Sequence, residues 1–346
     1  MTAPTRSTDP RAEYQAARTA VALADRSSFG RLRAFGAKRL DLLHRLITQD
    51  VRSLSPGQGA RAAMLTDKGR LMDELRLYVR EDHVVIVTSP GQSSAIKGHI
   101  ESLRFRDDVR LEDVTGDTAM IDLIGPAAPA LLAAASGGAA REELESLPRH
   151  HGRVLQIDGR AAVAVRTASL HERGLRLLVS AHDAATVWPA LLELGAAFGA
   201  SPIGEEALEV LRIERGQPRF GREITLEHNP LEARLDDAIS WTKGCYIGQE
   251  VVARLDSRHK ISRLLSGLRL TAADAPVPAP GAPVEAHGHP GIDAGQVTSA
   301  ARTFEPDETI ALAYLRQDSS APGTRVVVMV EGRLHEAIVS ELPFSG

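Results

Sequence analysis

The feature that most constrains the fold is a change of pattern at a proline-rich segment. Residues 271–283 carry four prolines among alanines, which favours an extended connector over a packed element. Before this segment, strand-like and helix-like patterns alternate, whereas residues 284–346 show strand periodicity broken by glycine turns. Interleaved helices and short adjacent strand pairs favour an α+β fold over a doubly wound parallel sheet. The sequence therefore predicts a polar leader at 1–17, an α+β region at 18–270 and a small all-β module after the connector.

A strand–glycine–helix pattern occurs twice within the predicted α+β region. The first copy is a strand at 31–35, Gly36 and a helix at 38–47, and the second is a strand at 121–124, Gly125 and an Ala/Leu-rich helix. The two glycines are 125 − 36 = 89 residues apart. This recurrence suggests two related α+β lobes, although the pattern is common enough to recur by chance.

The overall charge argues against a polyanion as the main partner. Lys and Arg number 41 against 45 Asp and Glu, a net charge of −4, and the aromatic residues total 7 + 4 + 2 = 13, too few for stacking platforms. We therefore do not expect direct nucleic-acid binding, although a local basic cluster leaves an RNA-binding regulator open: Arg258, His259, Lys260 and Arg263. A solvated loop explains the same cluster equally well.

No apolar run reaches the roughly 18 residues that span a bilayer, and residues 1–11 are polar, without the hydrophobic stretch of a signal peptide. The sequence therefore predicts a cytoplasmic protein with no membrane partner. A monomeric state is compatible with this composition. The sequence shows no pattern of ligands that would predict a metal site.

Cys245 is the single cysteine, which excludes a disulfide within one chain and any site built from several of its own thiolates. Gly244 and Gly248 flank it and permit a tight turn just before a predicted helix. A helix N-terminus and the nearby ammonium of Lys243 would both favour the thiolate, giving a nucleophilic or metal-binding sulfur. The alternative is a lone cysteine acting as a small buried apolar residue.

The stretch around this cysteine, KGCYIGQE at 243–250, resembles the KGCYxGQE signature of YgfZ-type folate-binding proteins, relatives of the glycine-cleavage T-protein, an aminomethyltransferase. The resemblance extends to further blocks along the chain: LITQDV at 46–51, KGR at 68–70 with Asp73, LRIERG at 211–216 with Pro218 and FGRE at 220–223, PLEA at 230–233, GQVTS at 295–299 and LPF at 342–344. It implies two α+β lobes and a C-terminal β-barrel, arranged as a three-lobed ring around a central tetrahydrofolate channel.

The resemblance also implies particular acids. Glu214 matches the family's pterin-binding glutamate, and a carboxylate suits that role because it can accept both hydrogens from the amidine-like edge of a reduced pterin. Asp73 and Glu74 stand where the T-protein carries a second acid near the reacting folate nitrogens, where a carboxylate could steer proton transfer or stabilise developing positive charge. Which of these two acids faces the site is open, and solvent-facing carboxylates are the alternative.

The remaining expected folate contacts come from the same motifs. Arg222 and Lys243 are candidate cationic partners for the glutamate tail of the folate, and Tyr246 and Gln249 of the signature are expected among the cofactor-binding residues. Each cation can equally be a solvated surface charge. The expected cofactor is tetrahydrofolate or a one-carbon derivative of it.

The resemblance favours a tetrahydrofolate-binding accessory protein that supports iron–sulfur enzyme assembly or repair, and thereby tRNA modification, through a reactive thiol at Cys245. Iron–sulfur proteins would then be its clients. A folate-dependent aminomethyltransferase or demethylating one-carbon transferase is the alternative, because the acids at 73 and 74 are present. Whether the protein turns over a substrate is open at this point.

Overall fold

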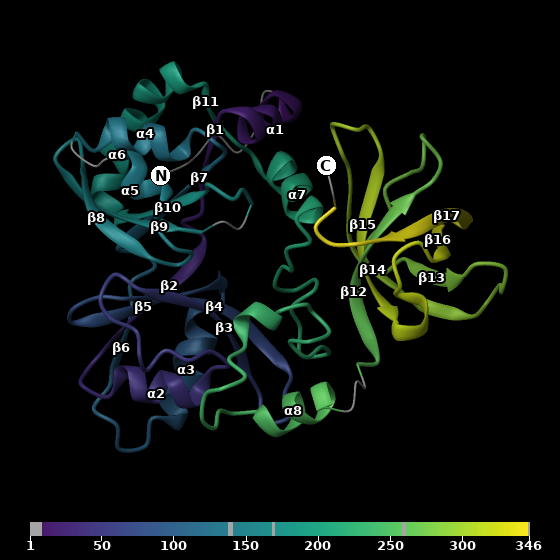
Figure 1. Cartoon of the computed structure of the whole chain (residues 1–346), viewed down its shortest axis with the longest axis horizontal. Coiled ribbons are helices and arrows are strands. Elements are labelled where there is room, and N and C mark those ends of the chain that lie inside the picture. The colour runs from purple at the N-terminus through teal and green to yellow at the C-terminus, as the bar shows by residue number, and fades with distance from the viewer. Residues whose placement is uncertain (1–8, 138–140, 168–169, 258–260, 345–346) are drawn as a thin grey trace. The chain divides into compact units, whose positions relative to one another are not determined.

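The computed structural model describes residues 9–137, 141–167, 170–257 and 261–344. The chain divides into two compact units (Figure 1). The first unit comprises Met1–Leu65, Asp73–Ala207 and Asp237–Ile247, and the second comprises Thr66–Met72, Leu208–Asp236 and Gly248–Gly346. Each unit is therefore built from segments that are distant in sequence.

The first unit contains two mainly antiparallel sheets with helices packed on them (Figure 1). The five-stranded sheet has the order β3 (Gly59–Leu65), β4 (Leu71–Val79), β5 (His83–Pro90), β2 (Phe29–Phe35), β6 (Arg110–Asp113), and carries α2 (Arg39–Leu46) and α3 (Ser93–Leu103). The six-stranded sheet has the order β11 (Ala200–Pro202), β1 (Val21–Asp25), β7 (Thr118–Ile124), β10 (Leu175–Ser180), β9 (Arg160–Arg166), β8 (Gly152–Ile157), with α4 (Ala128–Ala135), α5 (Arg141–Glu145) and α6 (Ala181–Gly195).

Both copies of the strand–glycine–helix pattern are present, one in each sheet. Gly36 links β2 to α2 with φ +106°, and Gly125 links β7 to α4 with φ +131°. A Cβ at Gly36 would lie 2.0 Å from the carbonyl oxygen of Asp108, and one at Gly125 would lie 2.5 Å from that of Ala20. Only glycine fits either position, because a side chain would be strained and would collide with the main chain. The two lobes suggested by the recurrence thus share this local construction.

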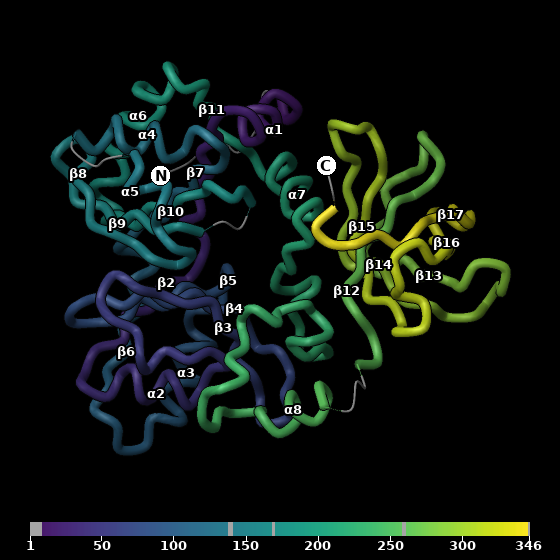
Figure 2. The backbone as a smooth tube through the Cα atoms, in the orientation of Figure 1, coloured from purple at the N-terminus to yellow at the C-terminus, as the bar shows by residue number. Residues whose placement is uncertain are grey.

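A closed barrel in the second unit completes an α+β fold, which confirms the predicted fold class. Its strands, coloured green to yellow in Figure 2, neighbour one another in the order β12 (Arg263–Leu270), β15 (Thr309–Arg316), β14 (Asp293–Arg302), β13 (Pro283–Ala286), β16 (Arg325–Val330), β17 (Arg333–Ser340). The same unit includes most of α7 (Glu205–Glu214) and all of α8 (Gln249–Ser257). The barrel interior is filled by small and branched apolar side chains, among them Val284, Val297, Leu315, Val326 and Val339.

The proline-rich segment 271–283 connects two strands of this barrel, since β12 precedes it and pairs with β15 and β17. Ala275 within it is buried, and its carbonyl accepts a hydrogen bond of 2.7 Å from the Thr309 hydroxyl. The barrel therefore starts before the connector rather than after it.

Part of the expected leader is a helix. Residues Pro10–Thr19 form α1, whose first turn is capped by the Asp9 carboxylate, which accepts hydrogen bonds from the amides of Arg11 and Ala12. Tyr14 and Ala17 are both buried on the face of α1 that contacts β1. None of the helices in the described ranges is long and apolar enough to cross a membrane.

Glu223 links the C-terminal part of α7 to the barrel within the second unit. Its carboxylate is fully buried and accepts hydrogen bonds from Arg212 Nη1 (3.1 Å), the Arg219 amide (2.9 Å) and Ser299 Oγ (2.6 Å). Its carbonyl accepts a further bond of 2.7 Å from the Tyr314 hydroxyl. Because each carboxylate oxygen is satisfied, burial of this charge is compensated. The end of α7, which carries Glu214, is thereby fixed against β14 and β15.

Candidate functional site

Thr48 joins three segments of the first unit that are far apart in sequence. Its amide donates to the Ala63 carbonyl of β3 (3.0 Å), and its hydroxyl oxygen accepts from the Ala63 amide (2.8 Å). The same hydroxyl donates to the Ala238 carbonyl (2.6 Å), and the Thr48 carbonyl accepts from the Ser240 amide (3.0 Å). Thr48 is fully buried, so its hydroxyl acts as donor and acceptor at once. The 237–247 segment is thereby attached to the edge strand β3.

Lys243 attaches the same segment to the end of α2. Its ammonium donates to the carbonyls of His44 (2.5 Å), Ile47 (2.7 Å) and Gln49 (3.0 Å), and its side chain is buried. The last carbonyls of a helix lack partners within the helix and carry partial negative charge, so an ammonium satisfies them well. Burial lowers the Lys243 pKa to about 8. All three ammonium hydrogens have acceptors, which leaves none for a folate tail.

Cys245 lies between two buried side chains of this segment. Lys243 precedes it and Tyr246 follows it, with the ammonium 5.2 Å from the centroid of the tyrosine ring. The Ile247 amide donates to the Arg45 carbonyl of α2 (3.2 Å). Burial raises the Tyr246 pKa to about 12, so the phenol stays neutral. The Cys245 thiol is free and exposed, which rules out the alternative of a buried apolar cysteine.

Gln249 is the first residue of α8 and is half-buried. Cys245 therefore precedes the first residue of the helix by four positions. The sequence predicts Cys245 next to a helix N-terminus, but the influence of a helix dipole falls off within about one turn, and Cys245 stands outside the first turn of α8.

Asp73 and Glu74 are adjacent on β4 and so project to opposite faces of the sheet. Asp73 is fully buried, with Oδ1 accepting from the Glu74 amide and Oδ2 from the Ser89 amide, both at 2.9 Å. Burial raises the Asp73 pKa to about 6, even though the hydrogen bonds from Ser89 and Glu74 favour the charged form. A carboxyl with this pKa changes charge close to neutral pH.

Glu74 is engaged by two guanidinium groups. Arg61 of β3 donates to both of its oxygens (3.1 and 3.0 Å), and Arg76 contacts Oε1 at 2.8 Å. Burial alone would raise the Glu74 pKa, but the two arginines lower it to about 2. Arg61 also contacts Asp237 Oδ1 at 2.7 Å. The acid on β4 is therefore connected through Arg61 to the start of the segment that carries Cys245.

The other two predicted contacts belong to the second unit. Glu214 is the last residue of α7, is 9% exposed, and its carbonyl accepts the Phe344 amide at 2.7 Å. Arg222 is exposed in the turn next to Glu223. Of the basic cluster considered for RNA, residues 258–260 lie outside the described residues, and Arg263 pairs with Asp293 at 3.6 Å.

Two residues of this arrangement were not singled out from the sequence. Arg61 lies in a strand in which every residue is buried, and an arginine inside such an apolar run is a signal for a paired charge. Asp237 gave no comparable signal, because its role depends on a partner 176 residues away. Over the described ranges, no three His, Cys, Asp or Glu side chains are grouped so as to hold a metal ion.

Replacement of Lys243 by Met tests its structural role. We expect Lys243→Met to lower the free energy of unfolding of the first unit by about 2–4 kcal/mol, because two buried carbonyls and a third, part-buried one lose a charged donor. Both tryptophans, Trp188 and Trp241, belong to this unit, so urea unfolding followed by their fluorescence reports on it alone. Lys38→Met is the matched control, since Lys38 at the opposite end of α2 is exposed and should lose under about 1 kcal/mol. Equal losses for the two variants would contradict this role.

Glu74→Gln should lower the free energy of unfolding by about 3–5 kcal/mol at pH 7, since two arginines lose their buried partner. The Glu74 pKa is about 2 in the fold and 4.5 in the unfolded reference, so the ionised carboxylate stabilises the fold fully above 4.5. The difference between wild type and variant should therefore narrow as the pH falls from 4.5 towards 2. The control Glu112→Gln removes a surface pair with Arg110 and should cost under about 1 kcal/mol. A difference that does not change with pH would refute the assignment.

Comparison with known proteins adds family information to this geometry. The GCVT N-terminal domain matches residues 4–243, and the glycine cleavage T-protein C-terminal barrel domain matches residues 263–345. An aminomethyltransferase of Symbiobacterium thermophilum is 32% identical over 338 residues, covering 96% of this chain and 88% of the relative. One from Geobacillus kaustophilus is 30% identical over 339 residues, covering 96% and 89%.

The fold is similar to a solved structure as well. The glycine cleavage system aminomethyltransferase T from Bartonella henselae matches with a TM-score of 0.87 at 24% identity, over 99% of this chain and 91% of that one. The two domain matches together span both the α+β part and the barrel. The chain therefore belongs to the glycine cleavage T-protein family.

Proposed function

We propose that this chain is a tetrahydrofolate-binding accessory protein that supports iron–sulfur enzyme assembly or repair, and thereby tRNA modification, through the thiol of Cys245. The observation that carries the proposal is an exposed, free thiol on a segment whose neighbouring side chains, Lys243 and Tyr246, are buried. A thiol with no role in packing is available for chemistry. The KGCYIGQE stretch, which resembles the YgfZ signature, supports the same assignment.

Folate binding is part of this proposal and follows from the family. The relatives are named aminomethyltransferases, and folate is the one-carbon acceptor expected from the resemblance. Glu214 is the proposed partner of the pterin amidine edge, because a largely buried carboxylate can accept two hydrogens there. Arg222, which is exposed, is the proposed partner of the glutamate tail, and Tyr246 and Gln249 are proposed ring contacts. We assign Lys243 the structural role of holding the 237–247 segment against the end of α2, since all three hydrogens of its ammonium already have carbonyl acceptors.

A single thiolate cannot retain an iron–sulfur cluster, whose usual ligand set is four cysteines. The proposed action is therefore transient. The Cys245 sulfur loses its proton when it binds an iron of the client's cluster and regains a proton when the client's own ligand replaces it. No electron is transferred in this exchange, so no oxidant or reductant is required.

A one-carbon transferase is the second candidate. It is favoured by the raised pKa of Asp73, near 6, which suits proton transfer at neutral pH. The family match over nearly the whole chain also favours it. Against it, Asp73 is fully buried and both of its oxygens accept main-chain hydrogen bonds.

One pair of variants separates the two candidates. In cells lacking this gene, we expect Cys245→Ser to leave sulfur-modified tRNA nucleosides at the level of the deletion, while wild type restores them, as measured by mass spectrometry. Calorimetry should show tetrahydrofolate affinity within about twofold of wild type, because the thiol is not a proposed folate contact. Full restoration by Cys245→Ser would refute the accessory role.

The second arm uses purified protein with tetrahydrofolate and an aminomethylated lipoyl carrier. A transferase would form methylenetetrahydrofolate, and Asp73→Asn would abolish that product whereas the exposed control Asp158→Asn would not. Wild-type protein that binds tetrahydrofolate without forming product would exclude the transferase and leave the accessory role in place.

A further inference from the structure

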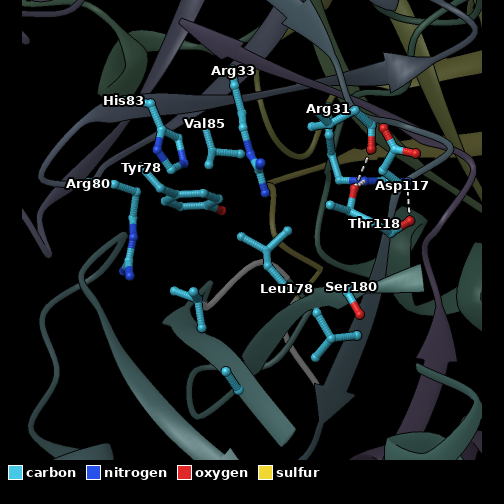
Figure 3. Close-up of a pocket in the computed structure, with 14 residues that line it drawn as sticks. Arg31, Arg33, Tyr78, Arg80, His83, Val85, Asp117, Thr118, Leu178 and Ser180 are labelled. Carbon is cyan, nitrogen blue, oxygen red and sulfur yellow. Dashed lines mark hydrogen bonds between the residues drawn. The ribbon is translucent and has the colours of Figure 1, made fainter. Parts of the chain in front are cut away.

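We propose that the first unit holds a second ligand site, between its two sheets, for a small organic monoanion with an apolar body. The site is a cavity of about 350 Å³ whose lining includes Tyr78, Arg80, Val163 and Leu178 (Figure 3). None of its lining residues belongs to the proposed folate or thiol chemistry. The volume is within the range of small-molecule pockets, which run from about 300 to 1,000 Å³.

One wall of the cavity is a row of side chains across the five-stranded sheet. Val85 of β5 is opposite Arg33 of β2 on one side and opposite Tyr78 of β4 on the other. Residues that pair directly across neighbouring strands project to the same face. Figure 3 shows all three side chains directed towards the cavity, with the tyrosine ring beside the valine.

The facing wall comes from the six-stranded sheet and is apolar. Leu178 of β10 is opposite Val163 of β9, and both pack in one cluster with Tyr78 and Val85 of the first wall. The two sheets therefore meet along this cluster, and the cavity lies beside it. An apolar ring or short chain placed there would contact hydrocarbon on both sides.

The far end of the cavity is closed by Arg31, which is fully buried (Figure 3). Its guanidinium donates to the carbonyls of Ser27, Thr115 and Thr118, and its Nε donates to the Thr118 hydroxyl at 2.7 Å. These donors are used, so Arg31 is part of the wall rather than a ligand contact. Asp117 lines the same end and would repel a second negative charge.

The other cations of the lining are free to bind a ligand. Arg33 and Arg80 are half-buried, and within the part of the chain that the structure describes neither guanidinium forms an ion pair or a hydrogen bond. The Nε of Arg33 is buried without a partner. His83 differs, since its ring contacts the Asp82 carboxylate at 2.6 Å. A buried, unsatisfied guanidinium donor is costly unless an acceptor reaches it.

These walls define the ligand class. The planar, forked guanidinium groups of Arg33 and Arg80 match the geometry of a carboxylate. The Val85, Tyr78 and Leu178 surfaces fit an aromatic or short aliphatic body. Because Asp117 lies at the opposite end, one negative charge is favoured over two.

The test compares a carboxylate with its neutral amide. By ¹⁹F NMR, we expect 4-(trifluoromethyl)benzoate to bind wild-type protein saturably, and 4-(trifluoromethyl)benzamide at least about tenfold more weakly. Arg33→Gln and Arg80→Gln should each weaken the carboxylate by about tenfold and leave the amide unchanged. Leu178→Trp should abolish both by filling the cavity. The exposed control Arg106→Gln should change neither.

Several results would overturn the site. The site is overturned if wild-type protein shows no saturable binding, if the carboxylate and the amide bind with equal affinity, or if Arg80→Gln leaves the affinity for the carboxylate unchanged. Displacement of the probe by tetrahydrofolate would also overturn it, because the probe would then occupy the folate site. Should Leu178→Trp fail to fold, the two arginine variants decide, with thermal unfolding midpoints confirming that they are intact.

Discussion

The Lys243 ammonium bound to the carbonyls at the end of α2 is the interaction on which the proposed site depends. A buried cation needs partners, and the chain at the end of α2 supplies three carbonyls, those of His44 in the last turn, Ile47 at the C-cap and Gln49 just beyond the helix. Thr48 adds hydrogen bonds from the same stretch to β3 and to the 237–247 segment. The blocks at 46–51 and 243–250 are nearly 200 residues apart in sequence, yet Lys243 of the second bonds to Ile47 and Gln49 of the first. The exposed Cys245 lies in this second block.

The general architecture could be predicted because local chemistry specifies it. Gly36 and Gly125 mark their turns since no other residue tolerates those positions.

The start of the barrel was not predicted, because β12 contains Gly267, which weakens a strand pattern. Glycine occupies this position because of a tertiary contact, since a Cβ on Gly267 would lie 2.7 Å from the Phe344 ring. Helix α1 was assigned to a polar leader because only a few of its side chains, such as Tyr14, are buried.

The residue types of the proposed site could be predicted from the sequence, but the contacts between them could not. The motif around Cys245 indicated a reactive thiol and left a buried cysteine as the alternative, and the family resemblance indicated Asp73 and Glu74 of β4. Their electrostatics depend on partners that spacing cannot reveal: Arg61 sets the charge of Glu74, and burial sets that of Asp73. Lys243 was expected to contact folate, yet its partners are main-chain carbonyls 194 to 199 residues earlier in the chain. Long-range contacts of this kind are a property of the fold alone.

The central claim is that the thiol of Cys245 is exposed in the native protein and available for chemistry. Because the chain has a single cysteine, the rate of alkylation by iodoacetamide, followed by mass spectrometry, reports on this thiol without interference. The account predicts complete modification of the folded protein without denaturant. A thiol that reacts only after unfolding would contradict it.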